Sequence, residues 1–135
     1  MSRETSFTPL TVEVLPDGRH YKLTKDMVVF SHRIGVTIIP AGFVTDMASV
    51  PRGFWNLFPP TGPYAKAAVY HDYLYQLGSV SRADADREFV EGMRALGVCW
   101  ITRMAMWAAL RLFGWKAWDE YTNQRIFMGE MDSGD

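Results

Sequence analysis

Residues 64–97 read YAKAAVYHDYLYQLGSVSRADADREFVEGMRALG, and this stretch decides the fold of the 135-residue chain. In its first part, small and apolar side chains recur at three- and four-residue steps, which is typical of one helix face, and Gly78 is a natural C-cap. Ser81 then supplies an N-cap, Asp84 completes an approximate capping box, and Gly97 ends the second periodic segment. The stretch therefore predicts two antiparallel helices joined by a short turn.

The residues before this stretch alternate apolar and polar side chains and are rich in strand formers, which is typical of short β-strands. The turn sequence Pro-Asp-Gly at residues 16–18 predicts a hairpin. We expect short antiparallel strands over about residues 5–40. The Pro- and Gly-rich residues 41–63 are expected to form an ordered loop.

The residues after this stretch are expected to add a third helix over about residues 98–113 and a short fourth one over residues 115–121. The helical part then covers residues 64–121, and residues 122–135 are expected to form a frayed tail. Strands followed by helices define an α+β fold. The length of 135 residues suits one domain, and we find no internal repeat.

Composition excludes several classes of protein. The formal net charge is -1, so no overall positive charge directs the chain to nucleic acid, and we expect no nucleic-acid partner. The most apolar stretch, residues 98–118, is interrupted by charged residues and glycine, so we expect no membrane span. The N-terminus lacks an apolar run of signal-peptide length. The single Cys99 excludes an internal disulfide, and its apolar surroundings predict a buried thiol.

His71 and Tyr75 are four residues apart and therefore share one helix face with small residues, which directs a polar pair toward the core. A buried imidazole needs partners, and Asp86 lies on the inward stripe of the next helix. We expect a hydrogen bond from His71 to Asp86 that fixes the tautomer and leaves the second ring nitrogen facing a cavity. This arrangement suits a general base, so His71, Asp86 and Tyr75 are candidate catalytic residues. The alternative is a purely structural buried pair.

Asp72 lies about 100° around the same helix, so its carboxylate is expected to project toward the preceding loop, which carries Asp46. Two carboxylates with backbone carbonyls form an oxygen-donor set that suits Ca²⁺ or Mg²⁺ better than structural zinc. Asp46 and Asp72 are therefore candidate metal ligands. The alternative is that these Asp residues cap helices or hold turns.

A second polar cluster lies in the same loop. Arg52 is placed to bind an anionic ligand or to hold Asp72 or Asp86 in an ion pair, and the ion pair is the plainer interpretation. Trp55 is expected to line an apolar pocket or to seal the core beneath the loop. Ser49 has no nucleophile-elbow motif around it, so it is read as a turn or cap residue. The expected site-lining residues are Thr45, Ser49, Arg52 and Trp55.

Four motifs in this order resemble the small phage and prophage family catalogued as domain of unknown function 1353. They are TD-x-ASVPR at residues 45–52, P-x-G-x-Y-x-x-A-A at residues 60–68, HD-x-LY at residues 71–75 and R-x-x-A-D-x-x-F at residues 82–89. The resemblance covers roughly residues 40–114. It implies a phage setting, with the protein in the host cytoplasm during phage production or in the virion, and it implies no particular activity.

The HD-x-x-Y helix followed by an Asp on its partner helix is also similar to secreted phospholipases A2, including the bacterial type. In that family the His activates water, the adjacent Asp holds Ca²⁺ and the later Asp orients the His. The similarity implies these roles for His71, Asp72 and Asp86, with Tyr75 supporting the Asp. This chain has no flanking disulfide and no glycine-rich calcium loop before the helix. The similarity therefore supports hydrolysis more than a lipid substrate.

Two functions follow as hypotheses. The first is a metal-assisted His-Asp hydrolase that acts on an ester or amide bond of the envelope or cell wall. The second is a non-enzymatic virion or assembly protein, associated with a phage tail, in which the His-Asp cluster is structural. Its partners would be other phage structural proteins or further copies of itself, because the Met-rich, aromatic C-terminal region suits an interface. A membrane-surface role for Trp107, Trp115 and Trp118 is a further alternative.

Overall fold

The computed structural model describes residues 5–18, 20–45 and 64–133, with the side chains of the last four of these left aside. Within these residues, six short strands precede three helices. The elements are β1 (Ser6–Phe7), β2 (Val12–Val14), β3 (Tyr21–Leu23), β4 (Met27–Ser31), β5 (Gly35–Ile39), β6 (Val44–Thr45), α1 (Ala65–Leu77), α2 (Arg82–Ala95) and α3 (Trp100–Ser133). The predicted α+β fold with N-terminal strands is confirmed.

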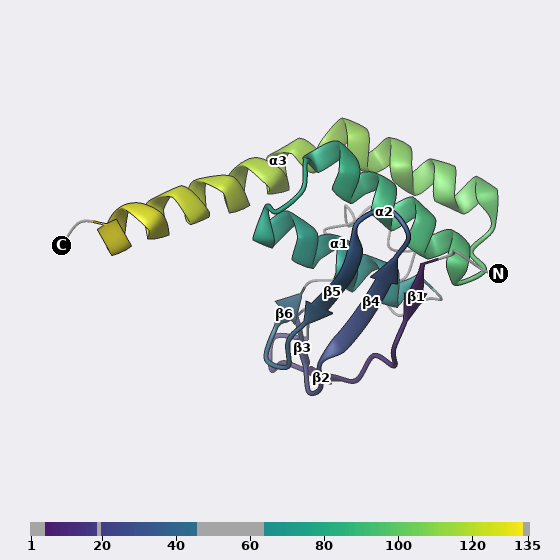
Figure 1. Cartoon of the computed structure of the whole chain (residues 1–135), viewed down its shortest axis with the longest axis horizontal. Coiled ribbons are helices and arrows are strands. Elements are labelled where there is room, and N and C mark those ends of the chain that lie inside the picture. The colour runs from purple at the N-terminus through teal and green to yellow at the C-terminus, as the bar shows by residue number, and fades with distance from the viewer. Residues whose placement is uncertain (1–4, 19, 46–63, 134–135) are drawn as a thin grey trace.

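The strands form two small antiparallel sheets that lie below the helices in Figure 1. One sheet has the order β1-β4-β5 and the other the order β2-β3-β6. The predicted hairpin joins β2 to β3, and the backbone N–H of Gly18 donates to the carbonyl of Leu15 at 2.9 Å. Asp17 accepts a hydrogen bond from the backbone N–H of His20 at 3.0 Å, which holds the turn. The sheets thus follow from local turn chemistry and strand alternation.

The α1 and α2 helices have the predicted ends. Gly78 adopts a left-handed conformation with φ of 68°, and its N–H donates to the carbonyl of Leu74, which closes α1. Ser81 caps α2 by accepting a hydrogen bond from the backbone N–H of Asp84 at 3.1 Å. The tight connection between them makes α1 and α2 antiparallel neighbours, and α2 also packs on α3.

The C-terminal region differs from our expectation. A single helix, α3, runs from Trp100 to Ser133, so the two predicted helices are one and the predicted frayed tail over residues 122–135 is wrong as far as Ser133. Gly114 lies inside this helix, where it is buried against Tyr75 and leaves no room for a side chain. Cys99 is exposed just before α3, so the predicted burial of its thiol is also wrong. The final turns of α3, after Arg125, extend away from the body of the protein (Figure 1).

Two apolar clusters hold these elements together. The first joins the sheets to α1, with Met27 and Val29 of β4 against Tyr70 and Leu74. The second joins the three helices, and its buried members are Tyr64, Ala67, Ala68, Phe89, Met93, Val98, Met106 and Leu110. Only the first half of α3 contributes to this helical core. Among the described helices, none combines the length and apolar character that a bilayer-crossing segment needs.

Candidate functional site

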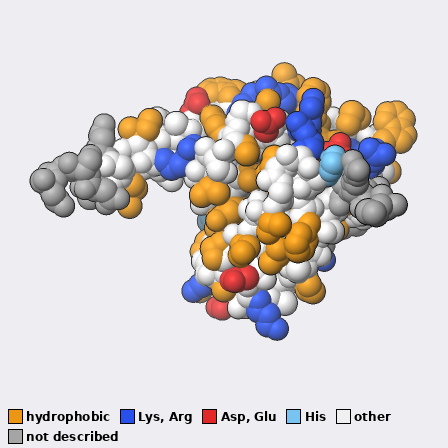
Figure 2. All heavy atoms as spheres, viewed as in Figure 1, with side chains coloured by type: hydrophobic (Ala, Val, Ile, Leu, Met, Phe, Trp, Pro, Cys, Tyr) orange, Lys and Arg blue, Asp and Glu red, His pale blue; other side chains and the backbone are white. Residues whose placement is uncertain are grey.

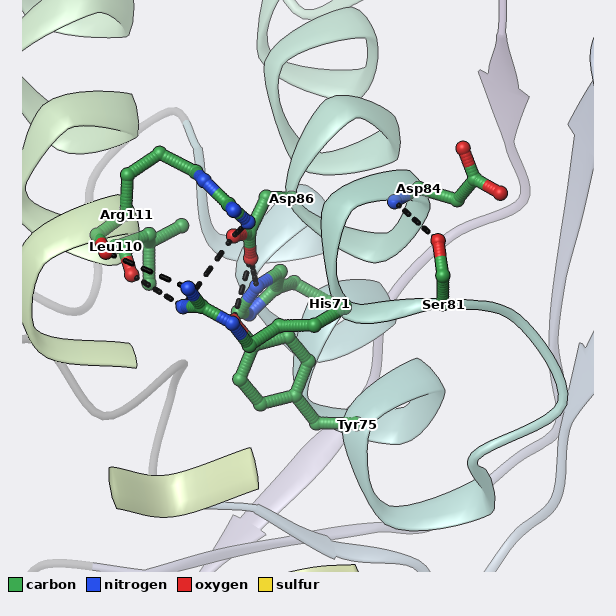
Figure 3. Close-up of polar contacts among 8 residues, drawn as sticks. His71, Tyr75, Ser81, Asp84, Asp86, Leu110 and Arg111 are labelled. Carbon is green, nitrogen blue, oxygen red and sulfur yellow. Dashed lines mark hydrogen bonds and ion pairs between the residues drawn. The ribbon is translucent and has the colours of Figure 1, made fainter. Parts of the chain in front are cut away.

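The predicted pairing of α1 with α2 through His71 and Asp86 is present (Figure 3). Nε2 of His71 lies 2.8 Å from Oδ1 of Asp86, and the hydroxyl of Tyr75 donates to the same oxygen at 2.5 Å. His71 and Tyr75 lie one turn apart on α1, which brings both groups to one carboxylate. Asp86 is fully buried, so these bonds replace all of its hydration.

The other carboxylate oxygen of Asp86 faces α3. Nη1 of Arg111 donates to Oδ2 at 2.8 Å, and Nη1 of Arg82 lies 3.9 Å from the same atom. Arg82 also donates to the backbone carbonyl of Leu110 at 3.0 Å and to that of Arg111 at 3.4 Å. Asp86 therefore links all three helices, because each helix contributes at least one donor near its carboxylate.

Asp86 is charged in this environment. Burial raises the pKa of its carboxyl, but the hydrogen bonds from His71, Tyr75 and Arg111 outweigh burial and hold the pKa below its ordinary value. Burial and the neighbouring Asp86 carboxylate raise the pKa of the Tyr75 hydroxyl, so Tyr75 remains a neutral donor. The buried Asp86 carboxylate is consequently a paired charge, because both of its oxygens accept hydrogen bonds.

The imidazole of His71 lies against aromatic side chains. The residue is 1% exposed, and its ring lies against Tyr75 and Phe89, with ring centroids 4.1 and 5.0 Å away. Nδ1 of His71 is buried and has no hydrogen-bond partner among the described residues. The bond to Asp86 is the one predicted for a general base, and the expected cavity at the second nitrogen and the catalytic role stay predictions.

Gly114 allows α3 to approach the network. A Cβ atom at this position would lie 2.8 Å from the Tyr75 hydroxyl and 3.3 Å from Nη1 of Arg82. Any larger residue at position 114 would displace the groups that surround Asp86. The glycine is therefore a packing requirement of the site.

Asp72 is buried near this network, and its hydrogen-bond partners are different residues. Its carboxylate accepts hydrogen bonds from the side chain of Gln76 at 3.2 Å and from the hydroxyl of Tyr121 at 3.1 Å. The second predicted ligand, Asp46, lies outside the described residues. Within the described residues, no group of three His, Cys, Asp or Glu side chains is arranged to hold a metal ion. The proposed Ca²⁺ or Mg²⁺ site stays a prediction.

The remaining predicted site residues come from the loop. Thr45 ends β6 and is buried at 1% exposure. Ser49, Arg52 and Trp55 lie outside the described residues, as does the expected contact of Arg52 with Asp72 or Asp86. The structure therefore places the helical residues of the predicted site and Thr45. The roles of Ser49, Arg52 and Trp55 stay predictions.

Three residues of the site were not predicted: Arg111, Arg82 and Tyr121. Arg111 interrupts an apolar run, and a cation within such a run often turns toward a buried anion. Arg82 follows the N-cap of α2 four residues before Asp86, a spacing that favours an ion pair. Tyr121 carries no local signal, because it reaches Asp72 only through the continuous α3 helix.

The fold and the site together define a small α+β protein in which a buried network around the His71–Asp86 pair joins α1, α2 and α3. The chain belongs to the family described as Protein of unknown function (DUF1353), whose family model matches residues 21–110. That match includes His71, Tyr75 and Asp86 and ends just before Arg111.

A relative of known sequence is the uncharacterized protein y4jT of Sinorhizobium fredii (strain NBRC 101917 / NGR234). The two are 40% identical over 78 residues, which is 56% of this chain and 23% of the relative. The chain thus spans about a quarter of that protein's length. No solved structure matches this chain.

Proposed function

We propose that this protein is a non-enzymatic assembly protein of phage or prophage type that pairs with a second copy of itself through the first half of α3. The observation that carries the proposal is the apolar outer face of this helix. Six large apolar side chains lie there with 42–65% exposure: Trp100, Ile101, Met104, Trp107, Leu112 and Trp115. Figure 2 shows hydrophobic side chains along the upper surface, over α3.

This face is distinct from the side of α3 that packs on the body. Met106 and Leu110 are buried in the helical core. Further along α3, Trp118 packs edge-to-face on Tyr75, with the two ring centroids 5.2 Å apart. At about 100° per residue, Ile101, Met104, Leu112 and Trp115 lie roughly opposite Met106 and Leu110, and Trp100 and Trp107 lie at the edge of this face. Single exposed apolar residues are ordinary, but a continuous strip of this kind marks an interaction surface.

The face is suited to pairing with itself. Ala105 and Ala108 are exposed small residues between the large ones. In an antiparallel pairing centred between Trp107 and Ala108, the midpoint of the six residues, Trp107 of one copy lies opposite Ala108 of the other, so a large side chain meets a small one twice. A two-fold interface needs such self-complementarity, because the same surface contributes both sides.

The His–Asp network supports this function by fixing the helices. Arg111, which donates to Asp86, lies on α3 between Trp107 and Trp115. Arg111 shares a helical stripe with Trp107 and Trp115, so the network fixes the α3 segment that carries the exposed face. A rigid helix presents an interface at a smaller entropy cost than a mobile one.

The test is the molar mass of the purified chain, measured by light scattering over a range of micromolar concentrations. We expect a dimer that dissociates on dilution, as for an interface of moderate size. A monomer at every concentration would contradict the proposed pairing. Binding to lipid vesicles by such a monomer would instead favour a membrane-surface role for α3.

A second candidate function is the His71 hydrolase. The specific observation in its favour is the buried Nδ1 of His71, which has no hydrogen-bond partner among the described residues while Nε2 is held by Asp86. A general base needs such a free nitrogen and an orienting carboxylate. Asp46 and Asp72 would hold the Ca²⁺ or Mg²⁺ of this candidate, and its substrate would be an envelope or cell-wall ester or amide bond. The 1% exposure of His71 weighs against it, because the attacking water must reach this nitrogen.

Divalent cations separate the two candidates. We expect Ca²⁺ and Mg²⁺ at millimolar concentration to leave the melting temperature unchanged, because both Asp72 oxygens already accept hydrogen bonds from Gln76 and Tyr121. The measurement is thermal unfolding with each cation and with a chelator. An increase that disappears in the Asp72→Asn variant, but not in an Asp119→Asn control at an exposed position, would favour the hydrolase.

A further inference from the structure

A second polar site lies away from the His–Asp network, where the β4–β5 turn meets α2. A cavity of about 360 Å³ opens there, and its lining residues are Thr5, His32, Arg33, Glu88, Glu91, Arg94 and Ala95. Figure 2 shows acidic, basic and histidine side chains close together on the right of the molecule. The volume suits a small ligand.

Glu88 is the unusual member of this lining. It is 1% exposed, and its Oε1 accepts a hydrogen bond from the hydroxyl of Tyr70 at 2.8 Å. Its Oε2 is buried and has no hydrogen-bond partner among the described residues. Asp86, two residues earlier, has two arginine side chains near its carboxylate, whereas no ion pair of Glu88 occurs within the described part of the chain. A buried carboxylate oxygen without a donor is costly, which points to a donor supplied from outside.

The cavity carries both signs of charge. Glu91 lies one turn after Glu88 on α2, and Arg94 lies about one turn further on. Arg33 is 3.7 Å from Asp84 and is thereby partly neutralised. No ion pair joins Glu88, Glu91 and Arg94 to one another within the described residues. The ligand that fits such a lining has a cationic donor and an anionic group close together.

We propose that this cavity binds a small zwitterion of the α-amino acid class. Its ammonium group donates to Oε2 of Glu88 once the side chains that bury this atom move aside, with Glu91 nearby, and its carboxylate binds Arg94 at the rim. An inorganic cation fits less well, because two arginine side chains line the same cavity and no metal-holding group of three ligands exists among the described residues. A simple anion would leave Oε2 of Glu88 without a donor.

The first test is a titration of the ¹⁵N-labelled chain with each natural L-α-amino acid, followed by amide chemical shifts. We expect at least one of them to cause saturable shifts in the α2 segment that contains Glu88, Glu91 and Arg94. Its N-acetyl derivative lacks the ammonium donor and should bind about tenfold more weakly or worse. The proposal fails when no amino acid shifts these residues, or when the N-acetyl derivative binds equally well.

Variants then assign the contacts. Glu88→Gln keeps the acceptor for Tyr70 but removes the charge, so affinity should fall about tenfold or more while the melting temperature of the free protein stays the same or rises. Arg94 is exposed, so Arg94→Gln is expected to fold normally and to lose affinity as well. Arg87→Gln is the control, because Arg87 is exposed on α2 outside the cavity. Unchanged affinity in both Glu88→Gln and Arg94→Gln would overturn the proposal.

Discussion

The Asp86→Ala variant is expected to lose about 3–5 kcal/mol of unfolding free energy, the usual result of removing one partner from a buried charged network. The substitution leaves His71, Tyr75 and Arg111 without the carboxylate that each of them contacts at 2.5–2.8 Å. A domain of this size is stable by about 5–15 kcal/mol in total, so much of its stability depends on this single side chain. Chemical denaturation monitored by tryptophan fluorescence measures the change.

The matched control is Asp84→Asn, two residues earlier on α2. Asp84 interacts with Arg33 at 3.7 Å in a solvent-accessible pair, so this change should cost less than about 1 kcal/mol. Equal losses of unfolding free energy in the two variants would show that Asp86 is not the centre of the helical core.

Acid should weaken the same network. Because the folded-state pKa of Asp86 lies below its ordinary value of 3.8, its contribution is complete above that value and is lost as the pH falls through the lower, folded-state pKa. We therefore expect the stability difference between the wild-type chain and Asp86→Asn to be constant near neutral pH and to shrink below about pH 3.8.

The largest expected effect on assembly comes from the outer face of α3. The double variant Trp107→Lys with Leu112→Lys places two charges where the proposed pairing buries large apolar side chains, which are 42% and 65% exposed in the single chain. Because both copies carry the change, four charges enter one interface, and the dimer should dissociate completely. Light scattering measures the molar mass, and circular dichroism verifies that the fold is retained.

Phe30→Lys is the control for this variant. Phe30 lies on β4 and is 49% exposed, so it is an apolar surface residue of similar exposure outside α3. The Phe30→Lys chain should keep the mass of the wild-type chain. A double α3 variant that stays dimeric would show that copies associate through another surface.

The fold was predictable where local chemistry specifies it. Ser81 and Gly78 mark helix ends by capping and by left-handed backbone geometry, and these signals act within a few residues. The continuity of α3 was not predictable in this way. Gly114 reads as a helix breaker in sequence, and only the position of Tyr75 in the folded protein explains why a glycine is needed inside the helix.

The candidate site was predictable in part for the same reason. His71 and Tyr75 share a helix face, and Asp86 lies on the inward side of the neighbouring helix, so short-range periodicity brings them together. Arg111 reaches Asp86 over 25 residues, and Tyr121 reaches Asp72 over 49. Contacts at such separations depend on how α3 packs, which helical periodicity alone does not specify.

The distance between the two copies of Cys99 in the dimer tests the account most directly. Cys99 is the single cysteine and is exposed just before α3, so a nitroxide label attached there reports on the pairing of the helices. With a rise of about 1.5 Å per residue and an interaxial distance of about 8–10 Å, antiparallel pairing centred between Trp107 and Ala108 places the two labelled sites about 27 Å apart in a pulsed dipolar experiment. A distance of about 27 Å is the predicted result. No dipolar coupling, or a separation below about 20 Å as in a parallel pairing, would contradict it.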